Sequence, residues 1–546
     1  MTKSNRFRCL LVALALLFLC ALSISVSPST ATTRDPVQHN PPLLPLSHSS
    51  HGVAEGPASE HATAALTLTI YPTVIGTTTT YLGATEAGGF WSADLVDLGV
   101  NAYRLWTKMA ELEWWDDDDA LDGLWDDSEY GTPTIAEIKA DASSGFTNTV
   151  PWAWWDERFD DVQSWRYGLQ TRREIVAALV QNGITPIVVL RTYDDAGQPE
   201  QRPDAQWAPR PPVDDAFRHE WWEHCFAIAY WLNVRNDYGV THFEVLNEPD
   251  WAGQGWSEYG GTMADYAELV LYAHDAISYA NSFADLPVHL HAPVVASYSS
   301  PYIAYTLDHA DPAVQAVDYH IYAADVRPSI LAVRSTIDAH NPDAVHEPIW
   351  VSEWGALWSS YDTLDEALHT AEQLLTFSEE QVKGATLFNM YDWSSVPGQD
   401  YGLIDLQDDG QGGVLRVPTE SYYAFRLVAR GLNGGKARLE FLATNVPTGT
   451  HVMATRDADN FYVLVLRNEP GAAISVTVDL APADVGHSQA TVYEYSLFYK
   501  DEIVATPPIE AGRLTFTAPA EGVSLVVVPR PGAVPTWTIY LPMIGR

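Results

Sequence analysis

The chain has 546 residues, and at roughly 100–200 residues per domain this length allows two to four domains. Hydrophobic residues make up 47% and charged residues 18% of the sequence, which excludes a wholly disordered chain. The 30 Lys and Arg residues stand against 71 Asp and Glu, giving a net charge of −41. Because such a surface repels phosphate backbones and anionic lipids, we expect no nucleic-acid partner and no peripheral membrane binding.

The N-terminus has the pattern of an export signal. Basic residues precede an apolar run over 9–26, and small residues at 29–31 provide a cleavage site. We predict a signal peptide over 1–31 and a secreted protein without stable membrane insertion after cleavage. An uncleaved anchor is the alternative, since the apolar run is just long enough to span a bilayer. Cleavage would leave Cys225 as the one cysteine, so no intrachain disulfide could form.

Residues 32–65 mix Pro, Ser, His, Ala and Thr without periodicity and are predicted to form a flexible linker. From 66 to 431, short β-rich runs alternate with longer helical patterns, which indicates parallel βα units. We therefore predict the α/β class and a (β/α)8 TIM barrel. A doubly wound open sheet is the competitor, but the phosphate-binding glycine fingerprint that it often carries is missing after the first strand. The predicted strands are 81–84, 101–105, 185–190, 242–246, 288–295, 317–322, 349–352 and 385–390.

The helical signal stops beyond about 432. Apolar runs at 461–466, 474–478, 491–493 and 523–528 are separated by Gly, Pro, Asn and Asp. This pattern is typical of an antiparallel β-sandwich, which we place at 432–531. Residues 532–546 remain as a short C-terminal tail.

Two glutamates stand where a barrel carries its active site, at the C-terminal ends of strands. Glu248 follows the fourth predicted strand and Glu353 follows the seventh. A pair of carboxyl groups is what the hydrolysis of a glycosidic bond needs, one to protonate the leaving oxygen and one to attack the anomeric carbon or activate water. This chemistry needs no cofactor or metal, and we expect none.

Two segments around these glutamates are similar to those of a known group of enzymes. The segment 243–250, Phe-Glu-Val-Leu-Asn-Glu-Pro-Asp, resembles the acid/base segment of clan A glycoside hydrolases, and 350–355, Trp-Val-Ser-Glu-Trp-Gly, resembles their nucleophile segment. The resemblance implies that Glu248 is the general acid/base and Glu353 the nucleophile. Within the clan, 243–250 and the sandwich resemble the β-xylosidase-type family 39, whereas Glu353-Trp354-Gly355 resembles the cellulase-type family 5.

The same resemblance implies further site residues. Asn247 would bind a sugar hydroxyl, Arg104 would support Glu353, and Tyr322 would orient Glu353. His320 would lie in the site, and Trp393 would form the floor under the sugar. Structural alternatives remain for three of them: His320 as a hydrogen-bonded core residue, Arg104 as the partner of another carboxylate, and Trp393 as barrel packing.

The electrostatics of the pair give a further expectation. With Arg104 and Tyr322 near Glu353 and no cation near Glu248, Glu248 should keep its proton to about pH 6.

The chain holds 20 Trp, and many of them fall in predicted loops around the barrel mouth. Indole rings stack on the C–H faces of sugars, so we expect about half of these to contact an oligo- or polysaccharide, with Trp251 among them. The alternative is that they pack the long loops together. The tryptophans concerned are Trp114, Trp115, Trp152, Trp154, Trp155, Trp207, Trp251, Trp256 and Trp358.

The acidic run 116–119 suggests calcium, but Ala120 stands where a ligand is expected, which favours a solvated loop. The sequence thus predicts a secreted retaining β-glycosidase. A transglycosylase with the same residues and a non-catalytic carbohydrate-binding surface protein are the alternatives, and the sequence leaves the oligomeric state open.

Overall fold

The structure is a computed structural model, and the residues that it describes belong to the unit Ala64–Arg546. The signal peptide, most of the linker, the acidic run 116–119 and the tail, all predicted from the sequence, lie outside the described residues. The described ranges are 65–86, 89–108, 133–160, 170–191, 215–251, 261–340, 347–355, 361–392, 401–410, 413–483 and 489–530.

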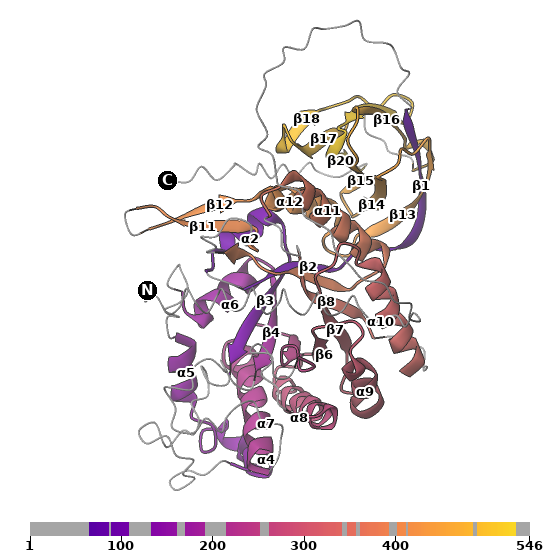
Figure 1. The fold of residues 1–546 in the computed structure, drawn as a ribbon. Coiled ribbons are helices and arrows are strands. Elements are labelled where there is room, and N and C mark those ends of the chain that lie inside the picture. Colours follow the sequence, from indigo (N-terminus) through magenta and orange to yellow (C-terminus); the bar gives the residue numbers. More distant parts are fainter. Residues whose placement is uncertain are drawn as a thin grey trace, which may run out of the picture. The chain divides into compact units, whose positions relative to one another are not determined.

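Eight parallel strands close into a barrel, as the sequence predicts (Figure 1). Each strand pairs with the next along the chain, and the last pairs with the first. The fold class is therefore confirmed as a (β/α)8 barrel, and the eight predicted strands are the eight observed ones. Their bounds are β2 (Tyr81–Thr85), β3 (Ala102–Lys108), β4 (Thr185–Arg191), β5 (His242–Val245), β6 (His289–Val295), β7 (Ala316–Ile321), β8 (Ile349–Trp354) and β9 (Gly384–Leu387).

Helices alternate with these strands and cover the outside of the barrel. Several begin at a threonine whose side chain accepts a hydrogen bond from the first turn, as Thr171, Thr262 and Thr363 do. Their bounds are α2 (Ser92–Leu98), α4 (Ile135–Ala140), η1 (Asp141–Ser144), α5 (Trp152–Asp160), α6 (Arg172–Gln181), α7 (Asp215–Tyr230), η3 (Trp231–Arg235), α8 (Met263–Asn281), α9 (Pro301–Ala310), α10 (Arg327–His340), α11 (Leu364–Glu379) and α12 (Glu420–Leu432).

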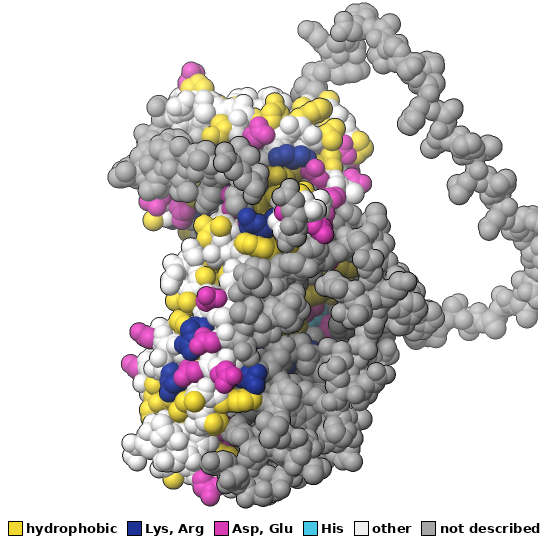
Figure 2. All heavy atoms as spheres, turned by 90° about the vertical axis from the view of Figure 1, so that its left-hand side faces the viewer, with side chains coloured by type: hydrophobic (Ala, Val, Ile, Leu, Met, Phe, Trp, Pro, Cys, Tyr) yellow, Lys and Arg dark blue, Asp and Glu magenta, His cyan; other side chains and the backbone are white. Residues whose placement is uncertain are grey.

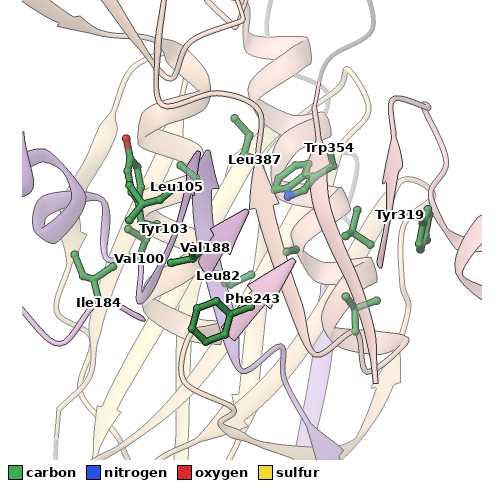
Figure 3. Close-up of a cluster of buried hydrophobic side chains, with 14 of the residues drawn as sticks. Leu82, Val100, Tyr103, Leu105, Ile184, Val188, Phe243, Tyr319, Trp354 and Leu387 are labelled. Carbon is green, nitrogen blue, oxygen red and sulfur yellow. The ribbon is translucent and has the colours of Figure 1, made fainter. Parts of the chain in front are cut away.

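The outward faces of the barrel strands form the core against these helices. Because side chains alternate along a strand, every second residue points outward, and these residues are apolar. Figure 3 shows Leu82, Leu105, Val188 and Phe243 from successive strands, all buried in one hydrophobic cluster. The inward-facing positions are thereby left for other residue types.

Aromatic and small residues fill the bottom of the barrel interior. The Trp350 ring stacks on Tyr81 with 5.1 Å between centroids and lies 4.4 Å from the His291 ring. Gly384 on the neighbouring strand makes room for the indole, since a Cβ there would lie 2.2 Å from the Trp350 ring. The polar residues above this layer therefore rest on a closed floor.

The second sheet contains one strand that the sequence analysis assigned to the barrel. The barrel is predicted to span 66–431, but β1 (Leu66–Thr77) pairs with β13 (Ala437–Thr444) and β16 (Ile474–Asp479) of the second sheet, which forms the β domain (Figure 1). The barrel therefore begins at β2. The nine strands follow the order β18-β17-β20-β15-β14-β13-β1-β16-β19, and their neighbours are antiparallel except for the parallel pair β1 and β16. The other bounds are β14 (Thr450–Arg456), β15 (Asn460–Asn468), η4 (Ala481–Ala483), β17 (Thr491–Ser496), β18 (Lys500–Ala505), β19 (Arg513–Ala518) and β20 (Glu521–Pro529).

A small third sheet follows the last barrel strand. It has the order β10-β11-β12 and is not among the predicted elements. Its strands are β10 (Tyr391–Asp392), β11 (Ile404–Asp408) and β12 (Val414–Pro418), and α12 comes directly after them.

Buried ion pairs join α12 to the β domain. Arg426 and Arg430 of α12 both bond the carboxylate of Asp501, whose side chain is fully buried. Tyr495 of β17 donates a hydrogen bond to Glu420 at 2.7 Å. The last helix of the barrel thus serves as the platform for the second domain.

The described surface carries both signs of charge. On the face in Figure 2, Lys and Arg side chains lie beside Asp and Glu side chains. Among the described residues, Arg173 and Asp160 form one such exposed pair, at 2.6 Å. Within the described ranges, no helix has the length and apolar character needed to cross a membrane.

Candidate active site

The chain turns sharply where it leaves β5. Leu246 and Glu248 both have positive φ, 62° and 51°, a region that few residues other than glycine adopt. The backbone N–H of Glu248 donates to the carbonyl of Val294 at 2.9 Å, which ties the turn to the end of β6. A strained backbone held in this way presents the Glu248 side chain at a fixed place.

Glu353 reaches the same place from β8. Both glutamates are nearly buried, with 7% of Glu248 and 6% of Glu353 exposed. A carboxyl oxygen of Glu248, one of Glu353 and a ring nitrogen of His320 all lie within 4.8 Å of one another. This upper limit on the distance between the two oxygens fits the short carboxyl spacing of retaining glycosidases, roughly 5–5.5 Å, and lies below the roughly 6.5–9.5 Å of inverting ones.

Hydrogen-bond donors surround the Glu353 carboxylate. Arg104 Nη1 donates to Oε1 at 2.6 Å, and the Tyr322 hydroxyl donates to Oε2 at 2.9 Å. Burial alone would raise the pKa of Glu353, but the charges of His320 and Arg104 and the hydrogen bond from Tyr322 outweigh it and lower that pKa. Glu353 is therefore held as a carboxylate.

Glu248 has a different environment. Burial raises its pKa, and the negative charge of Glu353 adds to that effect, while a hydrogen bond from His320 opposes it. The expectation of no cationic partner for Glu248 is wrong, because His320 Nδ1 lies 2.7 Å from Glu248 Oε1. Burial opposes a charge on His320, but the two carboxylates outweigh it and raise the pKa of the imidazole. One imidazole thus links the two carboxyl groups.

Arg104 organises the floor of the site. Its guanidinium is fully buried and donates through three nitrogens: Nη1 to Glu353, Nη2 to Asn247 Oδ1 at 2.9 Å, and Nε to Glu244 Oε2 at 2.7 Å. The Asn247 amide oxygen is thereby occupied, which leaves its N–H groups for another partner. Both sequence expectations for Arg104 hold in part, since it bonds Glu353 and also neutralises a second buried carboxylate.

Glu244, His291 and Asp318 are buried polar residues near the site that the strand-end motifs do not predict. They lie fully buried in the barrel interior, where Glu244 bonds Arg104 and His291 Nδ1 is 3.2 Å from Asp318 Oδ2. Their signal in the sequence is the alternation along each strand. In β5, Phe243 and Val245 pack outward, so Glu244 must point inward, where a buried carboxylate needs a partner.

Two clusters have residue types that could hold a metal ion. They are Glu244 with His291 and Asp318, and Glu248 with His320 and Glu353. Internal bonds already use these groups. The two ring nitrogens of His291 contact Asp318 and His242, and the Arg104 cation lies against both clusters. This donor set fits internal pairing better than it fits a cation.

Several of the tryptophans predicted to contact a sugar are not described by the structure. Trp393 lies outside the described residues, as do Trp114, Trp115, Trp207, Trp256 and Trp358. Trp251 is partly buried, and its N–H donates to the Glu248 carbonyl at 3.0 Å, which places it next to the acid.

Two of the tryptophans expected at the barrel mouth lie in the core instead. Trp152 and Trp155 of α5 are buried in the hydrophobic cluster, and Trp152 stacks on Tyr230 of α7. The segment is a helix rather than a loop, so these indoles pack between helices.

The architecture is similar to that of several solved structures. No protein-family model and no curated protein matches the chain. Solved structures do match over most of its length. A glucosidase from Croceicoccus marinus is 14% identical, with 86% of this chain and 99% of that chain covered and a TM-score of 0.58. A GH30 endoxylanase from Clostridium papyrosolvens is 14% identical, with 85% and 100% covered and a TM-score of 0.55.

A third example is an α-L-arabinofuranosidase from Thermotoga maritima, solved with arabinose. It is 14% identical and has a TM-score of 0.55, with 85% of this chain and 100% of that chain covered. The chain has the fold of glycoside hydrolases. The likeness includes the β domain, because the aligned 85% extends well beyond the barrel.

Proposed function

We propose that this protein is a secreted retaining β-glycosidase that cleaves oligo- or polysaccharides with Glu353 as the nucleophile and Glu248 as the acid/base. The observation that carries the proposal is the pair itself. Two buried carboxyl groups within 4.8 Å of each other have their pKa values shifted in opposite directions, down for Glu353 and up for Glu248. A pair with one ionised and one protonated member is what double displacement requires.

The first step forms a covalent intermediate. A Glu353 carboxylate oxygen attacks the anomeric carbon while the bond from that carbon to the leaving oxygen breaks, and Glu248 gives its proton to that oxygen. Arg104 and Tyr322 hold Glu353 in place through their hydrogen bonds. The Asn247 N–H groups, left over from the contact with Arg104, are available to a sugar hydroxyl.

The second step releases the sugar. Glu248, now a carboxylate, takes a proton from water, and the resulting nucleophile attacks the anomeric carbon and displaces Glu353. His320 contacts both carboxyl groups, so its charge stabilises Glu248 while that residue lacks its proton. The net configuration at the anomeric carbon is retained.

The substrate class and the location belong to the same proposal. The solved neighbours are named as a glucosidase, an endoxylanase and an arabinofuranosidase, which supports a glycan substrate. The apolar run and the small-residue site before residue 32 support export. Sequencing the N-terminus of protein collected from a secreting host should give a start at Thr32.

The nucleophile is tested by chemical rescue. Glu353→Ala should lower hydrolysis about a thousandfold or more, because no covalent intermediate can form. Azide should then enter the vacated space and yield an α-glycosyl azide from an aryl β-glycoside. Wild-type protein with azide is the control and should give no such product. Near-normal activity of the variant, or no azide adduct on any substrate of an aryl β-glycoside panel, would contradict the proposal.

A further inference from the structure

The Arg104 guanidinium lies between two carboxylates. Glu244 accepts from Nε at 2.7 Å, and Glu353 accepts from Nη1 at 2.6 Å. The side chains of Arg104 and Glu244 are both fully buried, so water screens neither ion pair. The single positive charge of Arg104 is therefore shared between the carboxylate assigned to the chemistry and one that is not.

Geometry gives Glu244 control over the direction of the guanidinium. A guanidinium is planar, and its nitrogens form a rigid array. With Nε fixed on Glu244, rotation within the plane is blocked, and Nη1 and Nη2 can only point at Glu353 and Asn247. The other Glu244 oxygen makes no hydrogen bond within the described residues, so the contact with Arg104 is what orients this carboxylate.

Charge gives Glu244 a second effect, on the proposed covalent step. Formation of the glycosyl ester consumes the negative charge of Glu353. Without Glu244, Arg104 would then have no hydrogen-bonded carboxylate, and only the more distant charge of Asp318 would oppose its own, which is costly for a buried cation. Glu244 takes no part in bond making and stays paired with Arg104 at 2.7 Å; burial raises the pKa of Glu244, and the ion pair with Arg104 opposes that rise and favours the charged form. It also weakens the hold of Arg104 on the free Glu353 carboxylate, which leaves that carboxylate more reactive.

We propose that Glu244 is a positioning residue for the nucleophile, which aims Arg104 at Glu353 and keeps a counter-charge on Arg104 while Glu353 is esterified. The inference rests on the proposed function, since it concerns the first of its two chemical steps. It distinguishes the two steps: loss of the Glu244 charge slows formation of the ester and does not slow its hydrolysis, which restores the Glu353 charge.

The test is Glu244→Gln, which keeps the shape of the side chain and its acceptor for Arg104 Nε but removes the charge. The acid limb of the pH profile of kcat/KM, which reports protonation of Glu353, should move about one unit lower. In stopped-flow experiments with a dinitrophenyl glycoside, the rate of glycosylation should fall about tenfold. The rate of deglycosylation should not fall. If glycosylation and deglycosylation slowed equally and the acid limb of the kcat/KM profile stayed in place, the inference would be overturned.

Two further variants separate charge from stability. Glu244→Asp keeps the charge on a shorter side chain, so the ratio of the glycosylation rate to the deglycosylation rate should stay near that of wild type. A fall in this ratio overturns the inference even if Glu244→Gln does not fold. Asp94→Asn is the matched control, because Asp94 is also a buried partner of an arginine, Arg416, away from the site. It should leave the acid limb in place, and a shift there would also count against the inference.

The failure of this inference can be distinguished from the failure of the proposed function. If wild-type protein cleaves no glycoside, the proposed function fails. The pKa of Glu353 can still be measured by ¹³C NMR of its labelled carboxyl group, assigned with Glu353→Gln. That pKa should be lower in Glu244→Gln than in wild type, and an unchanged value would overturn the inference on its own.

Discussion

At the scale of single residues, environment gives two identical side chains opposite properties. Glu248 and Glu353 are equally buried, and burial raises the pKa of both. The difference comes from the donors. Glu353 has Arg104 and Tyr322 as well as His320, while among the side chains that the structure describes Glu248 is hydrogen-bonded to His320 alone. Because the groups lie so close together, their titration belongs to the cluster rather than to one residue.

The acid role of Glu248 leads to a prediction about pH. Its raised pKa means that the protonated form persists above the ordinary range of a glutamate and is lost as pH rises through the shifted value. Activity should therefore fall on the basic side as Glu248 loses its proton, and Glu248→Gln should remove this basic limb. The pH profile of kcat/KM on an aryl glycoside measures the effect.

The same variant should discriminate between leaving groups. In a natural glycan the leaving group is a sugar alkoxide, which departs slowly unless Glu248 protonates it. Hydrolysis of such a substrate should therefore fall about 10²–10⁴-fold. Dinitrophenolate departs with little help, so a dinitrophenyl glycoside should lose far less. Equal loss on both substrates would show that Glu248 is not the acid.

The site residues that can be predicted from the sequence are those at the ends of strands. Glu248 and Glu353 were found because Asn-Glu-Pro and Ser-Glu-Trp follow recognisable strands. Glu244 and Asp318 lie inside strands, where a polar residue in an apolar run has no local partner. Their partners, Arg104 and His291, come from other strands, so only the closed barrel shows why the charges are tolerated.

At the scale of elements, the local patterns predicted the barrel strands well and the domain border poorly. Strands β2 to β9 are bounded by turn residues and alternate with helices, so composition alone locates them. β1 precedes them directly, and its apolar residues alternate as in any strand. Its partners, β13 and β16, begin at residues 437 and 474, and no local pattern encodes a pairing over that distance.

The floor of the barrel gives a prediction about packing. Gly384 on β9 lies against the Trp350 ring, and a methyl group there would have its carbon 2.2 Å from ring atoms. Neither a strand backbone nor a buried indole can move far, so Gly384→Ala should lower the free energy of unfolding by about 1–3 kcal/mol. Denaturant or thermal unfolding measures it. Gly471→Ala, with open space around it, is the control and should change stability by less than about 0.5 kcal/mol. If Gly384→Ala changed the free energy of unfolding no more than that control does, the floor of the barrel would have to rearrange to make room for the methyl group.

At the scale of the whole described chain, part of the β domain joins the hydrophobic core of the barrel, while other residues of its strands form a second cluster within the β domain. Leu464 and Leu525 of the β domain belong to the same buried cluster as the strands and helices of the barrel. The Leu464 side chain lies against Gly431 of α12, where a Cβ would be 2.9 Å away. Ion pairs from Arg426 and Arg430 to Asp501 fix the same junction. Each domain therefore covers apolar surface that the other would expose alone.

This shared core predicts that the two domains unfold together. Leu464→Ala should lower the free energy of unfolding by about 2–5 kcal/mol, because it leaves a cavity at a fully buried position. Although the substitution is in the β domain, the temperature at which glycosidase activity is lost should fall with the calorimetric transition, measured at one scan rate. Leu442→Ala is the matched control, since Leu442 is 54% exposed on β13 and should change neither temperature appreciably. Two separate transitions, with activity surviving the first, would show that the barrel is stable without its partner domain.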